Sequence, residues 1–497
     1  MINLDTIRQL RSDKIGFFRF RRLDKDTYLI TNDGGQYALL TLEEFQYFIG
    51  AHINSSHPRY KELLTKGFIK DSEYSNTLST AIQKRNHFLS YGPGLHIIIV
   101  TLRCNHKCQY CHAAAAPSSA KQFDMTEDIA RSTVDTLFYS PLNDITIEFQ
   151  GGEPLLNWKI VQFIIEYAIT KAQKLNKKVR FALVSNMSLM DEEKLSYLMK
   201  YKVGLSTSLD GTEEIHNYNR TFLEGNSFER VTHWIKRINA LYNEKHQSAG
   251  IGALLTVTKK TLSQSREVID TYRSLGLNSI FLRVLNPYGF AAGDLEKIGY
   301  SHDEFFEFFR ESLNYIIELN KAGIPFQESH SKIYLSKILT PFDPNFLDTR
   351  SPCGACIGQV AYNYNGKIYS CDEGRMLSRM GDEIFYMTEV SSDARETFTK
   401  MGECPTTKAM VQMSTLDGIP GYNESVYKPY LGVCPINSYK TTGNCIPTYS
   451  KDSKRKLDEK ILDFLFVLLK EKENERIFQS WLEGSPKMDA SSQCEAF

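Results

Sequence analysis

Between about residue 94 and residue 322, the chain alternates six times between a strand-like run and a helix-like run. Alternation of this kind predicts an α/β fold in which helices pack on a parallel sheet. Six units are too few to close a full barrel, so a partial TIM barrel, (βα)6, and a doubly wound sheet both remain open. The expected strands span residues 95–102, 144–149, 179–184, 203–209, 251–256 and 279–284, and the expected helices span residues 126–138, 158–175, 191–199, 228–242, 262–275 and 302–322.

Residues 1–92 follow a different pattern. Asn32-Asp33-Gly34-Gly35 lies between two strand-like runs and is a strong hairpin signal. Thr41-Leu42-Glu43-Glu44 is a capping box that opens a short helix, His57-Pro58 begins a second helix, and Gly67-Phe68-Ile69 turns back into a strand. These signals predict a winged-helix-like module, with an extension that packs on the main domain as the alternative. A densely basic helix for DNA is missing from the sequence, and the strands of such a module can take up a peptide instead.

The region after the alternating core changes again. Residues 326–450 are rich in Gly, Pro, Tyr, Asn and Cys and have few periodic segments, which favours a loop-rich fold built around metal. One amphipathic helix is expected over residues 454–484, and the tail 487–497 is expected to be mobile, with Cys494 as a bystander. The chain is therefore divided into segments 1–92, 93–325, 326–450 and 451–497.

Composition limits the class of partner. The chain has 59 Lys and Arg residues against 59 Asp and Glu residues, which argues against nucleic acid or an anionic membrane as the main partner. Its start shows no signal peptide and no run long enough to span a bilayer. Ten cysteines in such a chain indicate metal or redox chemistry in the cytoplasm rather than a disulfide framework.

Three of these cysteines follow the first expected strand directly. Cys104, Cys108 and Cys111 have C-x3-C-x2-C spacing. Three thiolates from one loop can hold three irons of a four-iron cluster and leave the fourth iron open to a small molecule. A zinc loop or three ordinary core cysteines are the alternatives, but zinc loops favour paired C-x2-C spacing.

Polar and glycine residues follow the other strands. Because active sites of parallel βα sheets form at the carboxyl ends of the strands, we expect these residues to gather near the cysteine loop. Taken singly, each has a plainer reading as a tight turn, a strand exit or a surface ion pair. The candidates are Gln150, Gly151, Gly152 and Glu153 after the second strand, Ser185 and Asn186 after the third, Ser208, Asp210 and Arg220 after the fourth, and Arg283 and Asn286 after the sixth.

The three-cysteine loop, with Tyr110 before its last cysteine, and the Gly-Gly-Glu-Pro turn at residues 151–154 resemble those of the radical S-adenosylmethionine (SAM) enzymes. This resemblance covers residues 94–325 and implies a (βα)6 partial barrel that holds a [4Fe–4S] cluster. It further implies that SAM binds the open iron through its amine and carboxylate. One electron then cleaves SAM to a 5′-deoxyadenosyl radical, which abstracts a hydrogen atom.

Later cysteines are similar to the SPASM extension of peptide-modifying members. Cys353, Cys356 and Cys371 match its C-x9-G-x4-C signature, which implies an auxiliary iron–sulfur cluster with Cys434 as the fourth ligand. The family run C-x2-C-x5-C-x3-C is absent here, so a second auxiliary cluster would need Cys404 and Cys445 with unusual partners. A zinc knuckle is the alternative.

Gln150 before the glycines and Ser208-x-Asp210-Gly-x4-His216-x3-Arg220 are similar to anaerobic sulfatase-maturating enzymes, which implies that the strand-end residues contact SAM. Asp372 matches the position of a general base there, with a structural carboxylate as the alternative. Residues 1–92 resemble instead the leader-peptide recognition domain of maturases of ribosomal peptides. The most similar of these is the radical SAM maturase of the His-Xaa-Ser repeat peptide systems.

These features favour an enzyme that modifies a ribosomally made precursor peptide. It would bind the leader sequence, abstract a hydrogen atom and oxidise the substrate radical through the auxiliary cluster, with flavodoxin or ferredoxin as electron donor. A sulfatase-maturase-like oxidase that produces formylglycine is the alternative. An iron–sulfur electron carrier and a DNA-binding regulator are less favoured readings.

Overall fold

The computed structural model of the 497-residue chain describes residues 13–244 and 250–483. The expected mobile tail and Cys494 therefore lie outside the described residues. None of the helices in the described ranges is long and apolar enough to cross a bilayer.

The centre of the fold is a parallel sheet whose strands follow one another in chain order. A doubly wound sheet reverses its strand order at a switch point, whereas this order never reverses. The fold is therefore a partial barrel and not a doubly wound sheet. Its six strands are β4 (Leu95–Thr101), β8 (Asp144–Gly151), β9 (Lys178–Ser185), β10 (Gly204–Ser208), β12 (Gly252–Thr256) and β13 (Ser279–Arg283).

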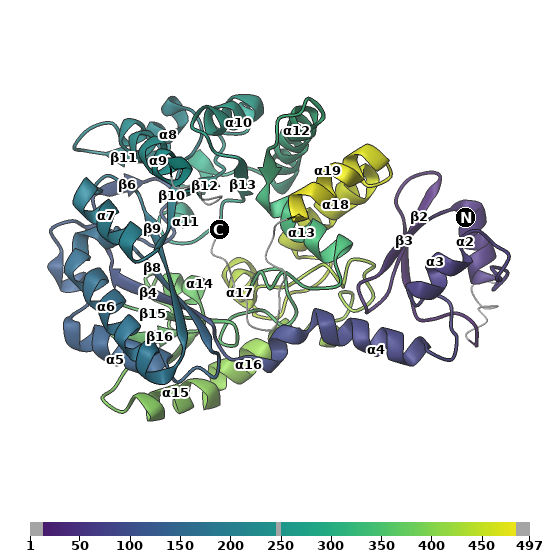
Figure 1. Cartoon of the computed structure of the whole chain (residues 1–497), viewed down its shortest axis with the longest axis horizontal. Coiled ribbons are helices and arrows are strands. Elements are labelled where there is room, and N and C mark those ends of the chain that lie inside the picture. The colour runs from purple at the N-terminus through teal and green to yellow at the C-terminus, as the bar shows by residue number, and fades with distance from the viewer. Residues whose placement is uncertain (1–12, 245–249, 484–497) are drawn as a thin grey trace.

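Helices connect these strands and lie on the outer side of the sheet (Figure 1). They pack on it because each has a single apolar stripe; in α6 the stripe is Val161, Ile164, Ile165 and Ala168. All six expected helices are confirmed to within a few residues at their ends. They are α5 (Glu127–Leu137), α6 (Trp158–Leu175), α7 (Glu192–Lys200), α9 (Ser227–Glu244), α10 (Ser265–Ser274) and α12 (His302–Lys321).

Short elements at the strand ends were not expected from the sequence. They are too short to show a hydrophobic period, and several occur in the loops that form the site. They are β5 (Arg103–Cys104), β6 (His106–Cys108), β7 (Ala116–Pro117), α8 (Glu213–Asn219), β11 (Arg220–Phe222) and α11 (Ala291–Ile298), with the 3-10 turns η1 (His87–Ser90), η2 (Lys121–Phe123) and η3 (Pro154–Asn157).

The segment after α12 extends the barrel sheet at both edges. Strand β14 (Gln327–Glu328) pairs with β13, and β15 (Gln359–Tyr362) pairs in parallel with β4, so that Gln359 lies opposite Leu95. Strands β16 (Lys367–Tyr369) and β17 (Tyr386–Glu389) then continue the sheet in antiparallel pairs.

The same segment keeps long loops, as expected, but also contains five short helices that its composition did not predict. The helices are short, and three of them begin at a cysteine N-cap. They are α13 (Ser329–Leu339), α14 (Asp372–Ser378), α15 (Ala394–Glu403), α16 (Pro405–Ser414) and α17 (Pro435–Thr442), with the turn η4 (Leu416–Gly418).

The chain ends in two helices, α18 (Ser453–Leu468) and α19 (Lys472–Leu482), where one was expected. The break is stabilised by Asn474, whose side-chain amide donates to the carbonyl of Leu468, a group that the end of α18 leaves without a helical partner. Dividing the segment lets both helices pack against α12 and α13.

The amino-terminal residues form a three-stranded sheet with its own small core (Figure 1). The predicted hairpin and capping box are confirmed, but residues 67–69 form only an isolated bridge from Ile69 to Ile15. The first strand was missed because three of its four residues are arginines. The elements are β1 (Arg19–Arg22), β2 (Thr27–Thr31), β3 (Tyr37–Thr41), α2 (Leu42–Ile49), α3 (Tyr60–Thr65) and the connecting helix α4 (Tyr74–Arg85).

This module is docked on the rest of the chain through its hairpin. The Thr31 hydroxyl donates to the carbonyl of Val426 at 2.6 Å, and the Tyr430 hydroxyl donates to the carbonyl of Gly35 at 3.2 Å. Arg85, at the end of α4, is buried and donates to the carbonyl of Pro429 at 2.7 Å. The position of the module is thus fixed by hydrogen bonds to residues 426–430.

Candidate active site

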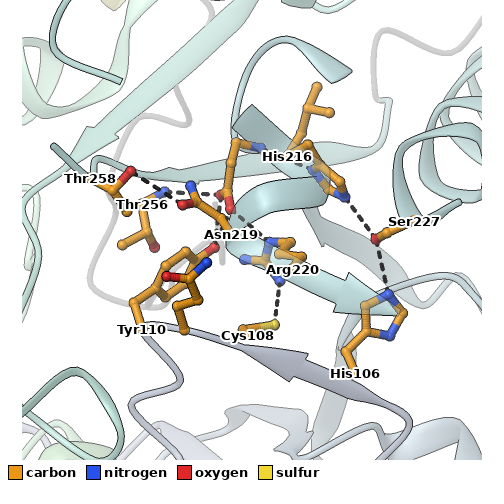
Figure 2. A network of polar contacts seen from close by, with 12 residues as sticks. His106, Cys108, Tyr110, His216, Asn219, Arg220, Ser227, Thr256 and Thr258 are labelled. Atoms are coloured by element: carbon orange, nitrogen blue, oxygen red, sulfur yellow. Dashed lines mark hydrogen bonds and ion pairs between the residues drawn. The ribbon is translucent and has the colours of Figure 1, made fainter. Parts of the chain in front are cut away.

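The loop after β4 is held against a segment more than 100 residues later in the chain. Within this loop β6 pairs in antiparallel fashion with β11, so that Cys108 lies opposite Arg220. The Arg220 Nη1 donates to the Cys108 Sγ at 3.8 Å (Figure 2). The ladder therefore brings together a thiol and a cation that the sequence places 112 positions apart.

The three thiols of this loop are half-buried, and their surroundings favour bound metal. Burial raises the pKa of the Cys108 thiol to about 12, although the charge of Arg220 opposes this rise. Ligation by iron must therefore displace protons that the thiols otherwise keep. On the other side of the loop, Asn186 Nδ2 donates to the Cys104 Sγ at 3.8 Å.

This donor set fits a four-iron cluster held by three thiolates. Within residues 13–244 and 250–483, no three His, Cys, Asp or Glu side chains converge on a position for one metal ion. A cluster separates its thiolates further than one ion does, because its irons and sulfides lie between them. N–H donors beside the sulfurs, as Asn186 and Arg220 supply, are typical of such sites.

The two glycines at the end of β8 are required because the backbone of the loop after β4 leaves no space for a side chain. A Cβ on Gly151, whose φ is +137°, would lie 2.1 Å from the Thr101 carbonyl oxygen, and one on Gly152 would lie 2.2 Å from that of Arg103. The Gly152 amide donates to the Thr101 carbonyl at 2.9 Å. This amide therefore does not face a ligand, and recognition of an ammonium group would fall to carbonyl oxygens, which are the acceptors that such a group needs.

Glu153 fastens the turn to the next strand. Its fully buried carboxylate accepts from the Ser185 hydroxyl at 2.9 Å and from the backbone amide of Asn186 at 2.8 Å. Burial raises the Glu153 pKa to about 7, against the effect of these hydrogen bonds. Glu153 and Ser185 therefore hold the loops in place, beneath the site rather than in it.

Asp210 has a similar supporting position. Its fully buried carboxylate accepts from the Tyr110 hydroxyl at 2.6 Å and from the Arg220 Nε at 3.0 Å. Burial by itself would lower the pKa of Arg220, but the charge of Asp210 outweighs this effect and raises it. Asp210 thus keeps Arg220 charged beside Cys108.

Inside the barrel lies a cavity of 2190 Å³. Six residues predicted from the sequence line it, namely Gln150, Ser208, Arg220, Arg283, Asn286 and Asp372. Tyr110 of the three-cysteine motif also lines it, as do His112 and Glu148, which reasoning from the sequence missed. A signal for Glu148 was available, because Glu148 and Gln150 are polar residues at alternate positions of the strand and so face the same side.

Asp372 is placed on the cavity wall at the start of α14. Its carboxylate forms an ion pair with Arg375 at 2.7 Å. Next to it, burial and the charges of nearby carboxylates raise the Glu373 pKa to about 7. Two neighbouring carboxylates, Asp372 and Glu373, therefore border the cavity.

The later cysteines form a loose group in the next region. Cys353, Cys371 and Cys434 are near one another. Burial raises the thiol pKa of both Cys371 and Cys434, and the nearby charges of Glu373 and of the other thiols raise it further. Cys371 and Cys434 are N-caps of α14 and α17, and their sulfurs accept the Gly374 and Asn437 amides at 3.4 Å. These amides favour thiolates, which suits metal ligation.

The remaining cysteines are placed differently. Cys356 follows Cys353 but also neighbours Cys404, whose sulfur lies 3.2 Å from the Thr407 hydroxyl oxygen. Cys445 is half-buried beside Asp382. The structure therefore brings Cys353, Cys371 and Cys434 together, with Cys356 between this set and Cys404, and leaves Cys445 apart.

Residues 98–298 match the family model described as Radical SAM superfamily. The chain is 22% identical over 370 residues to the radical SAM cyclopropyl synthase TigE of Paramaledivibacter caminithermalis, covering 70% of this chain and 73% of that protein. It is 25% identical over 283 residues to a cysteine-type anaerobic sulfatase-maturating enzyme of Clostridium perfringens, covering 54% and 71%. A match of 28% identity to an uncharacterised protein of Methanocaldococcus jannaschii covers 39% of this chain and 63% of that protein.

Among solved structures, native anSMEcpe with bound AdoMet has the same fold, with a TM-score of 0.62 and 17% identity. The match covers 78% of this chain and 100% of that chain. Together with the three-cysteine loop, these findings show that residues 98–298 are a radical SAM domain of an enzyme, of the superfamily that uses a [4Fe–4S] cluster and SAM, and that the cysteine-rich region after it is similar to the SPASM type.

Proposed function

We propose that this protein is a maturase that modifies a ribosomally made precursor peptide by radical hydrogen abstraction. The observation that carries the proposal is the size of the cavity beside the three-cysteine loop. At 2190 Å³ it exceeds the roughly 300–1,000 Å³ of ordinary small-molecule pockets and leaves room for a peptide segment next to SAM. The sulfatase-maturating relative, whose name describes action on another protein, supports the same reading.

When bound, the cluster and SAM supply the 5′-deoxyadenosyl radical. The chain's own residues bind and orient these groups. Arg220 is suited to the SAM carboxylate because it lies beside Cys108 and on the cavity wall. We assign direct contact with SAM to Gln150, Gly151, Gly152, Asn186, Ser208 and Arg220, and support of their loops to Glu153, Ser185 and Asp210.

Oxidation of the substrate radical requires a group that takes its proton. We assign this role to Asp372, because it lines the cavity and directly follows Cys371. The electron would leave through an auxiliary cluster on the nearby cysteines. A donor of the flavodoxin or ferredoxin type would reduce the first cluster, as expected of a protein working in the cytoplasm.

The amino-terminal sheet offers two edge strands to a leader peptide. In the β2–β3 pair, the Asn32 backbone amide donates to the Gln36 carbonyl. In an antiparallel pair every second residue bonds to the partner strand, and the residues between point their backbone groups away from it. The backbone groups of Tyr37, Leu39 and Thr41 therefore point away from β2, toward the free edge of β3. The Leu39 carbonyl, which accepts from Arg59, follows this pattern. The opposite edge of the sheet is strand β1. There the Leu23 backbone amide donates to the Thr27 carbonyl, so by the same alternation the backbone groups of Phe20 point away from β2. We propose that a leader peptide pairs with one of these edges.

Replacing Leu39 with proline tests the β3 edge. Proline removes an outward N–H but leaves the β2–β3 pairing intact, since this amide does not bond to β2. We expect the affinity for the precursor peptide to fall about tenfold, which corresponds to the loss of a hydrogen bond worth about 1.4 kcal/mol. SAM cleavage without peptide should be unchanged. Fluorescence anisotropy of a labelled peptide measures the affinity.

The matched variant is Phe20→Pro on the β1 edge. If the leader pairs with β3, Phe20→Pro should bind the peptide as the wild type does, and the reverse result would assign the leader to β1. Wild-type affinity in both variants would contradict β-strand addition at this module.

An auxiliary cluster predicts more than four irons per chain after anaerobic reconstitution. Because the Cys353, Cys371 and Cys434 group is separate from the loop after β4, the excess should persist when Cys104, Cys108 and Cys111 are replaced. Iron and sulfide assays with Mössbauer spectroscopy measure it. A wild type with only four irons would leave no auxiliary cluster to accept the electron.

A second candidate, oxidation of a sulfatase cysteine or serine to formylglycine, is favoured by the sulfatase-maturating relative. The docked amino-terminal module speaks for a leader-bearing peptide instead. Formation of formylglycine on a sulfatase-motif peptide, with no modification of a leader-bearing precursor, would decide for the second candidate. Salt-dependent duplex binding would point to a DNA-binding role of the module.

A further inference from the structure

A chain of hydrogen bonds runs beneath the three-cysteine loop (Figure 2). It begins at the backbone amide of Asp210, which donates to His216 Nδ1 at 3.3 Å. The Ser227 hydroxyl, at the start of α9, then lies 2.9 Å from His216 Nε2 and 2.9 Å from His106 Nε2. All four residues are buried, so these polar atoms depend on one another.

The direction of these bonds follows from the first donor. A backbone N–H can only donate, so His216 Nδ1 must accept and the imidazole proton is on Nε2. His216 Nε2 therefore donates to Ser227, and the single hydroxyl proton of Ser227 is left for His106 Nε2.

The other end of the chain gives the same direction. His106 Nδ1 lies 3.3 Å from Asn105 Oδ1, which also accepts from Asn186 Nδ2 at 3.0 Å. Asn105 Nδ2 donates to the Ser188 hydroxyl at 2.8 Å, which confirms that Oδ1 is the acceptor of this amide. His106 must therefore donate from Nδ1 and accept at Nε2, as the Asp210 end also requires.

We propose that Ser227 is a positioning residue for the SAM-binding site. Its hydroxyl joins two groups that flank the cluster thiols, namely Arg220 with Asp210 beside Cys108, and Asn186 with Asn105 beside Cys104. The inference rests on the proposed use of this loop to hold the cluster and SAM. Ser227 lies outside every motif that the sequence analysis identified.

The hydroxyl is needed because it donates and accepts at once. Without it, a buried donor on His216 and a buried acceptor on His106 lose their partners. A change of tautomer in either imidazole would restore one bond only by breaking another, at Asp210 on one side or at Asn105 on the other. The defect therefore reaches the groups that contact Cys108 or Cys104.

The test compares Ser227→Ala with Ser227→Thr, which keeps the hydroxyl. Ser140→Ala is the matched control, because Ser140 is equally buried and its hydroxyl donates to the Pro93 carbonyl at 2.7 Å, away from the loop. After anaerobic reconstitution, the electron paramagnetic resonance signal of the reduced cluster is titrated with SAM. In the iron-free protein, imidazole ¹⁵N shifts report the two tautomers, and thermal unfolding reports stability.

We expect Ser227→Ala to weaken SAM binding by about 10- to 100-fold, the usual effect of losing a residue that orients metal-site groups. Ser227→Thr should bind SAM as the wild type does, and Ser140→Ala should lose stability without losing SAM affinity. The wild type should show the Nε2–H tautomer at His216 and the Nδ1–H tautomer at His106.

Wild-type SAM affinity and spectrum in Ser227→Ala would overturn the proposal. If Ser227→Ala fails to fold, Ser227→Thr decides. Its wild-type behaviour supports the need for the hydroxyl, whereas its failure assigns Ser227 to packing and overturns the proposal. A wild-type protein that binds no SAM would instead contradict the proposed function.

Discussion

Alanine in place of Cys104, Cys108 and Cys111 is expected to abolish the formation of 5′-deoxyadenosine after reduction with dithionite. The three thiols occupy one loop at the end of β4, beside Arg220 and Asn186. Removing them leaves no soft ligands there to hold iron, so the electron that cleaves the SAM sulfonium is not delivered. The yield, measured by liquid chromatography and mass spectrometry under anaerobic conditions, should fall to that of a protein-free control.

Cys445→Ala is the control, because it removes a half-buried thiol from a position apart from the other cysteines. It should keep SAM cleavage at the wild-type level. Cleavage that survives in the triple variant would show that another site binds the catalytic cluster.

The second large effect is expected on stability, from Asp210→Ala. Arg220 is 11% exposed at its side chain and Asp210 is fully buried, so removing the carboxylate leaves a guanidinium charge buried without its partner. Breaking a buried ion pair in this way costs about 3–5 kcal/mol of the free energy of unfolding. The Tyr110 hydroxyl would lose its acceptor as well. Urea unfolding of the iron-free protein, followed by tryptophan fluorescence, measures the loss.

The double variant Asp210→Ala with Arg220→Met separates charge from packing. Because the unpaired charge is absent, it should recover much of the stability that Asp210→Ala loses. Equal losses in the single and double variants would mean that Asp210 acts through shape and not through its charge.

The repeating part of the fold could be predicted closely from the sequence. Residues 158–175 form a helix with the expected bounds because its apolar stripe is uninterrupted, and each parallel strand is an apolar run between turn signals. Prediction failed where tertiary contacts decide the structure. The break between α18 and α19 depends on a cap from Asn474, and α14 shows no single apolar face, because it buries Asp372 and Arg375 as well as Leu377.

The candidate site was predictable in its membership but less so in its roles. Spacing and strand ends identified the cysteines, Arg220 and Asp210 from the sequence alone. Two of these roles depend on contacts that spacing does not reveal. Asp210 supports Arg220, 10 positions later, and Glu153 fastens its loop to Ser185, 32 positions later. Ser227 gave no signal, because a serine at a helix start reads as an ordinary cap.

The parallel pairing of β15 with β4 places the two groups of cysteines at opposite ends of one strand. Gln359 lies opposite Leu95, so Cys356 lies near the amino end of β4. Cys104 follows the carboxyl end of the same strand. Cys371 is on the same side as Cys356, because the antiparallel β16 returns to Ala361 just before it. A strand of this length spans about 20 Å. The cysteine loop after β4 and Cys371 are thus at opposite ends of one strand, so under the proposed function the electron released by a substrate radical would leave at the end opposite to that where SAM is cleaved.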